Sequence, residues 1–472
     1  MIPSNMTLLT RRQLLGGCLS LAFGSSFPHA TCAGITGTLM VDPAQKLHTV
    51  PPNFIGLSYE SAQLANADFF SAANTPLIAL ICGLSPCGVL RLGGGTSNFT
   101  TYSQKTPEIS AAFEAFGPDT SHSVKQGTIT SARALHNLRA FLDQTNWSCI
   151  YGLNLGQGTK ENAAEEAEAV CSILGPRLLA LQIGNEPDAI GRYRPHGYSP
   201  DDYIREWLEF HEAIVARVPH AKFAGPDISH KLPYFMAFAR EAARHPDVIL
   251  LTFHYYAMGP AGNPLATTDN LLRADPQLAT LKWQGAAVIE DMARAMHLPC
   301  RVSEANSCWN GGQPGVSNTF ASTLWCADML LHFASLGMAG VHLHGGGQGW
   351  YSPIVGSPST GFQKRPEYFG IQFAQHFAAT TLLRTVLNCD SERISAWAAS
   401  NGDKHYLLAI INKANIGAKI QLTGPLSAAQ WNAQILAAPS LNAMDNIAFH
   451  ALKFRNPVHL PPHSALLAAS ED

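Results

Sequence analysis

Eight short apolar segments, separated by longer segments of helical character, constrain the fold of this 472-residue chain more than any other feature. In order, they cover residues 54–60, 88–95, 148–155, 178–187, 222–229, 248–256, 300–307 and 339–346. Most are continuous apolar runs, which is typical of parallel strands covered on both faces. Eight such strands alternating with helices over roughly 320 residues predict a (β/α)8 barrel, that is, an α/β fold of the TIM type.

One of the intervening helices is clearly marked at its start. Ser199 is a good N-cap, Pro200 suits the first turn, and Asp201 and Asp202 place acidic groups at the positive end of the helix. Large apolar residues then recur at helical spacing, at Tyr203, Trp207, Phe210, Ile214 and Val218. This pattern predicts an amphipathic helix that packs on the barrel.

The sequence changes character near residue 380. Short strand-like segments at 393–399, 405–412, 418–422, 431–436 and 465–469 are separated by Gly, Pro and Asn. This pattern is typical of an antiparallel β-sandwich. We therefore predict a catalytic barrel over 51–379 and a C-terminal β-sandwich domain over 380–472. An early strand within 34–50 is expected to become part of the sandwich.

Residues 1–33 have the features of an export signal. Arg11 and Arg12 precede a short apolar stretch and then small residues, which resembles a twin-arginine signal. The apolar stretch is too short to span a bilayer, so we predict export to the periplasm or outside the cell, with no stable membrane anchor.

Composition excludes some partners. Charged residues make up only 14% of the chain, the formal net charge is −3, and Lys and Arg form no run longer than a pair, so we predict no nucleic-acid partner. Eight of the ten cysteines lie beyond the signal and none forms a CxxC pair, so we predict free thiols and no metal site. A disulfide between Cys82 and Cys87 remains an alternative.

Two of the apolar segments end in a carboxylate. Glu186 follows the run that starts at Leu178, within Asn185-Glu186-Pro187, and Glu304 follows the run that starts at Cys300. Barrel enzymes carry their catalytic groups at the C-terminal ends of the strands, and most glycosidases use a pair of carboxyl groups. The alternative is that each glutamate is a strand-end charge facing solvent.

The ordered set of motifs resembles glycoside hydrolase family 79, the β-glucuronidase and heparanase group, from about residue 36 to the C-terminus. The motifs are Phe54-Ile-Gly-Leu-Ser-Tyr-Glu60, Leu90-Arg-Leu-Gly-Gly-Gly95, Ile183-Gly-Asn-Glu-Pro187, Phe253-His-Tyr-Tyr256, Val302-Ser-Glu-Ala-Asn306 and His342-Leu-His-Gly-Gly-Gly347. With the export signal, the resemblance indicates a secreted bacterial member. It implies a retaining β-glycosidase whose two carboxyl groups lie about 5–5.5 Å apart. Glu186 would be the acid/base, Glu304 the nucleophile, and Asn185 the residue that binds the sugar 2-hydroxyl.

Further residues are expected around this pair. His254 and Tyr256 share one face of a strand, and the resemblance places both at the site, with Tyr256 near the nucleophile. For His254, packing in an aromatic wall is the alternative. Glu60 is expected to bind sugar hydroxyls, and Arg91 to orient Glu304.

The resemblance also implies that a uronate carboxylate is bound by tyrosine hydroxyls and backbone N–H groups after the seventh and eighth strands. The candidates here are Trp309, Gly349, Trp350 and Tyr351. Trp309 stands where a tyrosine is expected, and either Trp350 or Tyr351 could be the inner residue. These two segments contain no Lys or Arg, so neutral donors would bind the carboxylate.

The glycine runs at 93–95 and 345–347 lack the spacing of nucleotide loops, so no cofactor is predicted. His342 and His344 alternate on one strand, without a Cys or carboxylate in the motif to complete a ligand set. The predicted partner is therefore a carbohydrate, and the predicted activity is exo-acting β-glucuronidase. The alternatives are a β-glucosidase or diglycosidase of the same fold, an endo-acting heparanase-like enzyme, and a noncatalytic carbohydrate-binding barrel.

Overall fold

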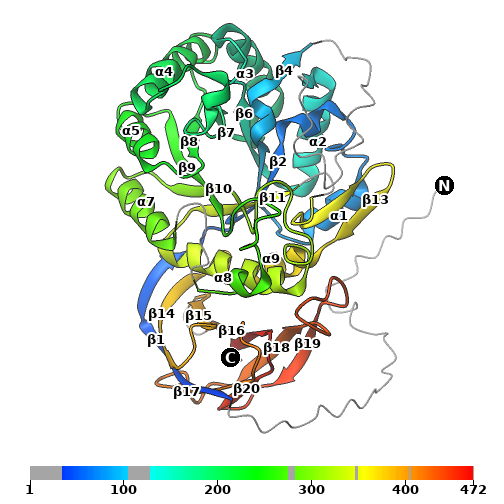
Figure 1. Cartoon of the computed structure of the whole chain (residues 1–472), viewed down its shortest axis with the longest axis vertical. Coiled ribbons are helices and arrows are strands. Elements are labelled where there is room, and N and C mark those ends of the chain that lie inside the picture. The colour runs from blue at the N-terminus through cyan, green and yellow to red at the C-terminus, as the bar shows by residue number, and fades with distance from the viewer. Residues whose placement is uncertain (1–33, 105–127, 275–281, 346–348, 403–404, 471–472) are drawn as a thin grey trace, which may run out of the picture. The chain divides into compact units, whose positions relative to one another are not determined.

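The structure is a computed structural model that describes residues 34–104, 128–274, 282–345, 349–402 and 405–470. Eight parallel strands close into a barrel, and their order around the ring follows the sequence (Figure 1). They are β2 (Ile55–Glu60), β3 (Val89–Gly93), β6 (Ser148–Leu153), β7 (Leu178–Ile183), β8 (Phe223–Ile228), β9 (Val248–Tyr256), β10 (Cys300–Asn306) and β11 (Gly340–Gly345). All eight coincide with the apolar segments of the sequence, and the predicted (β/α)8 barrel is confirmed.

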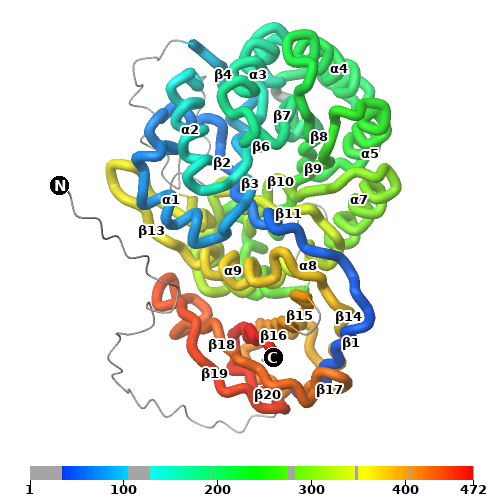
Figure 2. Tube along the Cα trace, turned by 180° about the vertical axis from the view of Figure 1, so that it is seen from behind, coloured from blue at the N-terminus to red at the C-terminus, as the bar shows by residue number. Residues whose placement is uncertain are grey.

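Helices surround the barrel, as the views from the two sides show (Figures 1 and 2). The longer ones are α1 (Thr75–Cys82), α2 (Ala132–Thr145), α3 (Lys160–Leu174), α4 (Pro200–Arg217), α5 (Leu232–Ala242), α7 (Trp283–Ala295), α8 (Phe320–Leu336) and α9 (Pro366–Gln375). The helix predicted after Ser199 is α4. It begins with a capping box in which Ser199 and Asp202 exchange hydrogen bonds, and it buries Tyr203, Trp207, Phe210 and Ile214.

The C-terminal part of the chain forms a nine-stranded sheet together with the early strand β1 (Ile35–Thr49). Its other strands are β14 (Thr381–Cys389), β15 (Ile394–Ser400), β16 (Tyr406–Asn412), β17 (Ala418–Thr423), β18 (Trp431–Ala437), β19 (Ala448–Lys453), β20 (Val458–Leu460) and β21 (Ser464–Ser470). All pairings are antiparallel except that of β1 with β17. The predicted sandwich is therefore one continuously hydrogen-bonded sheet, because β1 pairs with β14 along one edge and with β17 along the other.

Two small sheets extend the barrel loops. β4 (Thr100–Ser103) pairs with β5 (Thr128–Ser131), and β12 (Ile354–Ser357) pairs with β13 (Gly361–Lys364) in a hairpin after β11. The sequence did not predict these short strands.

Helix α8 is buried around nearly its whole circumference. Its Asp328 forms a buried ion pair with Lys413 and accepts a hydrogen bond from Trp397 Nε1 at 3.2 Å. Both partners belong to the C-terminal sheet region, which explains why this helix lacks a polar face.

The eight described cysteines are free thiols, including Cys82 and Cys87. Cys82 is exposed, so not all of these thiols are buried. Within the described residues, no helix is both long and apolar enough to cross a membrane. The predicted export signal, residues 1–33, lies outside the described residues, and both this signal and the division of the chain into domains stay predictions.

Candidate active site

Glu186 does not lie on a strand. Strand β7 ends at Ile183, and the chain then turns through Gly184 and Glu186, whose φ angles are +87° and +50°. The Glu186 N–H donates to the Asp227 carbonyl oxygen at 3.0 Å, which ties this turn to the end of β8. The sequence had predicted a strand through Pro187; the left-handed backbone ends it earlier and leaves the Glu186 side chain 31% exposed.

Glu304 lies within β10, next to an irregularity in the ladder. The register of β10 against β9 shifts between Val302 and Glu304. Such a bulge lets consecutive residues turn toward the same side of a sheet. Ser303 accordingly donates to Asp227, and Glu304 accepts from Arg91 at 2.7 Å. Glu304 is only 7% exposed.

Arg91, on β3, is fully buried and uses all five of its N–H groups. Its acceptors are Gln182, Ser58, Glu304, Asn185 and Asp227. The sequence expectation that Arg91 orients Glu304 agrees with this arrangement. The same guanidinium also fixes the amide of Asn185, because Arg only donates and its partner at 2.6 Å must be Oδ1.

Asp227, at the end of β8, is a member of the site that the sequence analysis missed. It accepts hydrogen bonds from Arg91, from Ser303 and, at 2.9 Å, from Gln182 Nε2. Burial alone would raise the pKa of Asp227, but the charges of Arg91 and His254 outweigh burial and hold this pKa far below its ordinary value. The signal in the sequence was an aspartate near the end of an apolar strand.

His254 lies between two carboxylates. Its Nδ1 is 3.0 Å from Glu186 Oε1, and its Nε2 is 3.3 Å from Asp227 Oδ2. Burial alone would lower the pKa of His254, but the negative charges of Glu304 and Asp227 raise it to about 10. The ring is therefore an imidazolium at neutral pH and donates to Glu186. These contacts do not fit the alternative of a histidine packed in an aromatic wall.

Tyr256, two residues further along β9, donates to Glu304 Oε1 at 2.6 Å. Side chains on one face of β9 therefore form hydrogen bonds with both candidate catalytic carboxyl groups. Burial alone would raise the pKa of Glu304, but the charges of His344, His254 and Arg91 and the bond from Tyr256 lower it below its ordinary value. Glu304 is thus ionised at neutral pH.

Glu60 and His344 form the opposite side of the site. Glu60 accepts from the Thr96 N–H at 2.8 Å and the Thr96 hydroxyl at 2.6 Å. His344 Nε2 is 3.5 Å from Glu60 Oε1, and its Nδ1 is 3.7 Å from Glu304 Oε2. The backbone passes so close here that a Cβ on Gly94 would lie 2.5 Å from the Glu60 carboxyl carbon.

The two histidines of β11 have different surroundings. His344 contacts the carboxylates, whereas His342 Nε2 accepts from Arg301 at 3.0 Å. The sequence analysis had considered the pair only as metal ligands, and so missed His344 as a neighbour of Glu304.

The described residues that were predicted to bind a uronate lie near Tyr351 and Tyr256. The Tyr351 ring is 7% exposed and lies edge-on to His344 at 5.9 Å, so Tyr351 is the inner residue. Trp350 instead lies under the Arg365 guanidinium, at 5.4 Å. Trp309 meets the Tyr256 ring edge-on at 6.3 Å.

A basic side chain, Arg365, lies beside the segments that contain Trp309 and Tyr351, although neither segment itself contains Lys or Arg. Arg365 follows β13, is partly buried, and donates to the Gly349 carbonyl oxygen at 2.9 Å. Burial lowers the pKa of Arg365. The β12–β13 hairpin thus brings a cation from outside the motif beside these segments, and the expectation that neutral donors bind the carboxylate stays a prediction. Gly346 and Gly347 lie outside the described residues.

Sequence comparison finds β-glucuronidases and heparanases among the similar known proteins. A β-glucuronidase of Aspergillus niger is 27% identical over 389 residues, which are 76% of this chain and 69% of that enzyme. Mouse heparanase is 21% identical over 336 residues, or 62% of each chain. No protein-family model matches the chain.

A solved structure shows the same fold. The 4-O-α-L-rhamnosyl-β-D-glucuronidase of Fusarium oxysporum aligns with a TM-score of 0.72 over 92% of this chain and 99% of its own, at 18% identity. Together with the barrel, these relatives identify the chain as a glycoside hydrolase that is similar in sequence to β-glucuronidases and heparanases.

Proposed function

We propose that this protein is an exo-acting, retaining β-glucuronidase in which Glu304 is the nucleophile and Glu186 the acid/base. The observation that carries the proposal is the different environment of two carboxyl groups that are both contacted by side chains from one face of β9. Glu304 is buried and bound by Arg91 and Tyr256, whereas Glu186 is 31% exposed at the edge of the site. Contrasting environments of this kind separate a nucleophile from a proton donor.

The first step forms a covalent intermediate. A carboxylate oxygen of Glu304 bonds to the anomeric carbon of the sugar as the bond to the aglycone oxygen breaks, and Glu186 gives its proton to that oxygen. Protonated His254 stays hydrogen-bonded to Glu186 and ion-paired with Asp227, so it orients the acid without supplying the proton itself.

The second step regenerates the enzyme. Glu186, now a carboxylate, takes a proton from water, and the water oxygen bonds to the anomeric carbon as the bond to Glu304 breaks. Two displacements at one carbon restore its configuration, so the product is released as the β-anomer.

Asn185 is suited to bind the sugar 2-hydroxyl. Its Oδ1 accepts from Arg91, which leaves the Nδ2 hydrogens to donate to a ligand. A bond to the 2-hydroxyl that strengthens in the transition state contributes to the rate in glycosidases. Arg91 thus prepares both Asn185 and Glu304 for the same sugar ring.

The preference for a glucuronide is inferred from the relatives and from the donors around Tyr351. We expect a higher kcat/KM for p-nitrophenyl β-glucuronide than for the matched β-glucoside, because donors facing a uronate would be left unpaired by glucose. In Tyr351→Phe the ratio of the two values should fall by about fivefold or more, the equivalent of roughly 1 kcal/mol for a bond to a charged group.

Trp350→Phe is the neighbouring control, and it should change this ratio less, because Trp350 contacts Arg365 rather than His344. A wild-type protein that hydrolyses the glucoside more efficiently would contradict the glucuronide assignment and favour a β-glucosidase. If Tyr351→Phe lowered kcat/KM equally for both substrates, Tyr351 would not bind the uronate carboxylate.

We also infer that the protein is a secreted bacterial enzyme. The support is in the sequence alone, in Arg11, Arg12 and the short apolar stretch that follows.

A further inference from the structure

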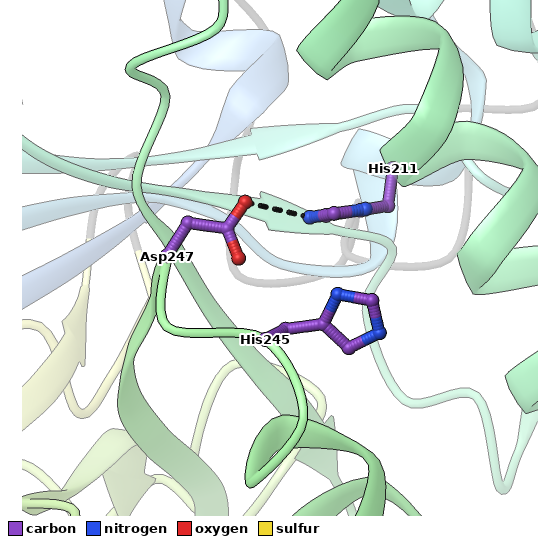
Figure 3. A group of neighbouring side chains, drawn as sticks. All are labelled: His211, His245 and Asp247. Atoms are coloured by element: carbon purple, nitrogen blue, oxygen red, sulfur yellow. Dashed lines mark hydrogen bonds and ion pairs between the residues drawn. The ribbon is translucent and has the colours of Figure 1, made fainter.

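A second cluster of ionisable side chains lies where α4 meets the turn between α5 and β9. His211 comes from α4, and His245 and Asp247 come from the turn (Figure 3). Asp247 directly precedes β9, whereas His254 and Tyr256 stand at the other end of that strand. The cluster is thus at the opposite end of β9 from the candidate active site, and the proposed reaction does not use it.

The side chains converge on one point. A ligand atom from each lies within 4.8 Å of the other two, and His211 Nε2 is 2.8 Å from Asp247 Oδ2. Figure 3 shows one ring nitrogen of His245 directed toward this pair. Because His245 Nε2 is held by Glu241 Oε1 at 3.1 Å, the nitrogen that faces the pair is Nδ1.

This use of Glu241 is a familiar feature of metal sites. A carboxylate that accepts from one imidazole nitrogen keeps the proton there, and leaves the lone pair of the other nitrogen for a metal. Glu241 is itself fixed, since its second oxygen accepts from Arg244 at 2.6 Å. His245 therefore has the tautomer and orientation that a ligand needs.

The other two side chains are also held in place. The Trp207 ring stacks on His211 with centroids 4.7 Å apart. The Asp247 carbonyl oxygen accepts from the Phe223 N–H at 2.8 Å, which anchors the turn to β8. These contacts hold His211 and the backbone of Asp247 in position beside His245.

We propose that His211, His245 and Asp247 bind a divalent transition-metal ion, with Zn²⁺ as the best match. Two imidazoles and one carboxylate are a common protein ligand set for Zn²⁺, with water as a fourth ligand. The side chains of His245 and Asp247 are 23% and 21% exposed, so water and the ion have access.

Binding requires local adjustment. Ligand atoms about 2.1 Å from a tetrahedral ion lie about 3.4 Å from one another. His211 and Asp247, now 2.8 Å apart, would therefore separate by roughly half an ångström, His211 would lose the proton between them, and any ligand atoms near the 4.8 Å limit of the cluster would move closer together. The ion would then join α4 to the α5–β9 turn and stabilise this end of the barrel.

The test uses the full chain without a histidine tag, stripped of metal by a chelator. We expect one equivalent of Zn²⁺ to bind by calorimetry, Zn²⁺ to raise the melting temperature, and Co²⁺ to give the visible absorption bands of a tetrahedral site. His245→Ala should remove the Co²⁺ bands and weaken Zn²⁺ binding at least about tenfold, and Glu241→Gln should weaken it about 10–100-fold by disturbing the ligand's support.

His220→Ala is the matched control, because His220 is an exposed histidine just beyond α4 and outside the cluster. It should bind Zn²⁺ as the wild type does. Hydrolysis of the glucuronide should persist in His245→Ala, which separates this proposal from the proposed activity. The proposal is overturned if the wild type shows no saturable binding, or if His245→Ala and Glu241→Gln both bind like the wild type.

Discussion

Replacing Glu304 with Gln is expected to abolish turnover. The amide keeps the size of the side chain but cannot form the covalent intermediate, and losing the nucleophile of a hydrolase lowers kcat by a factor on the order of 10⁴ or more. Steady-state hydrolysis of p-nitrophenyl β-glucuronide measures this loss. Glu209→Gln, on the exposed side of α4, is the matched substitution and should retain wild-type rates.

Glu186→Ala provides a second and different signature. Without the acid, substrates with activated leaving groups such as p-nitrophenol should suffer less than those with poor ones, and added azide should partly restore turnover by attacking the intermediate in place of water. Wild-type rates in Glu304→Gln would show that another residue is the nucleophile.

Replacing Arg91 with Met should have the largest effect on stability. The change removes the Arg91 cation from buried Asp227 and Glu304, and breaking a buried ion pair in this way lowers the free energy of unfolding by about 3–5 kcal/mol. Urea unfolding measures the difference. Arg133→Met removes an exposed pair with Asp68 and should cost less than about 1 kcal/mol.

The Arg91→Met substitution should also shift the pH dependence of kcat/KM. In the wild type the pKa of Glu304 is lowered, so its contribution to stability is complete above the unfolded-state pKa and is lost as the pH falls through the folded-state pKa. Without Arg91 the pKa of Glu304 rises, and the acid limb of kcat/KM should move to higher pH. An unchanged profile and unchanged stability would contradict the central position given to Arg91.

The barrel could be predicted because its parallel strands are buried on both faces and therefore appear as continuous apolar runs. The C-terminal sheet was harder to predict. Strand β19 is largely solvent-facing and β20 has only three residues, so neither gives a strong pattern. In β14 the buried residues are confined to Leu382 and Leu383, which also obscures its nine-residue length.

Site residues could be predicted only where they lie within a recognisable sequence motif. Glu186 and Glu304 stood out as carboxylates after apolar runs, and the motifs around them brought in Asn185. Asp227 and His344 were missed because their importance comes from contacts across the barrel, with Arg91 and Glu304, which no local pattern encodes.

Two further features were equally hidden from the sequence. The bulge that turns both Ser303 and Glu304 inward is a property of strand register. The His211, His245 and Asp247 cluster joins a helix to a turn 34 residues further along, and lacks the spacing of a known metal motif.

The proposal that Glu304 and Glu186 act by double displacement on a β-glucuronide is tested most directly by the configuration of the first product. Proton NMR of the early phase of p-nitrophenyl β-glucuronide hydrolysis, recorded before mutarotation, resolves the two anomeric signals. Two displacements at the anomeric carbon predict that β-glucuronic acid appears first and that the α-anomer grows in only later. An initial α-anomer would contradict the two-step mechanism and would require an inverting enzyme, with carboxyl groups about 6.5–9.5 Å apart.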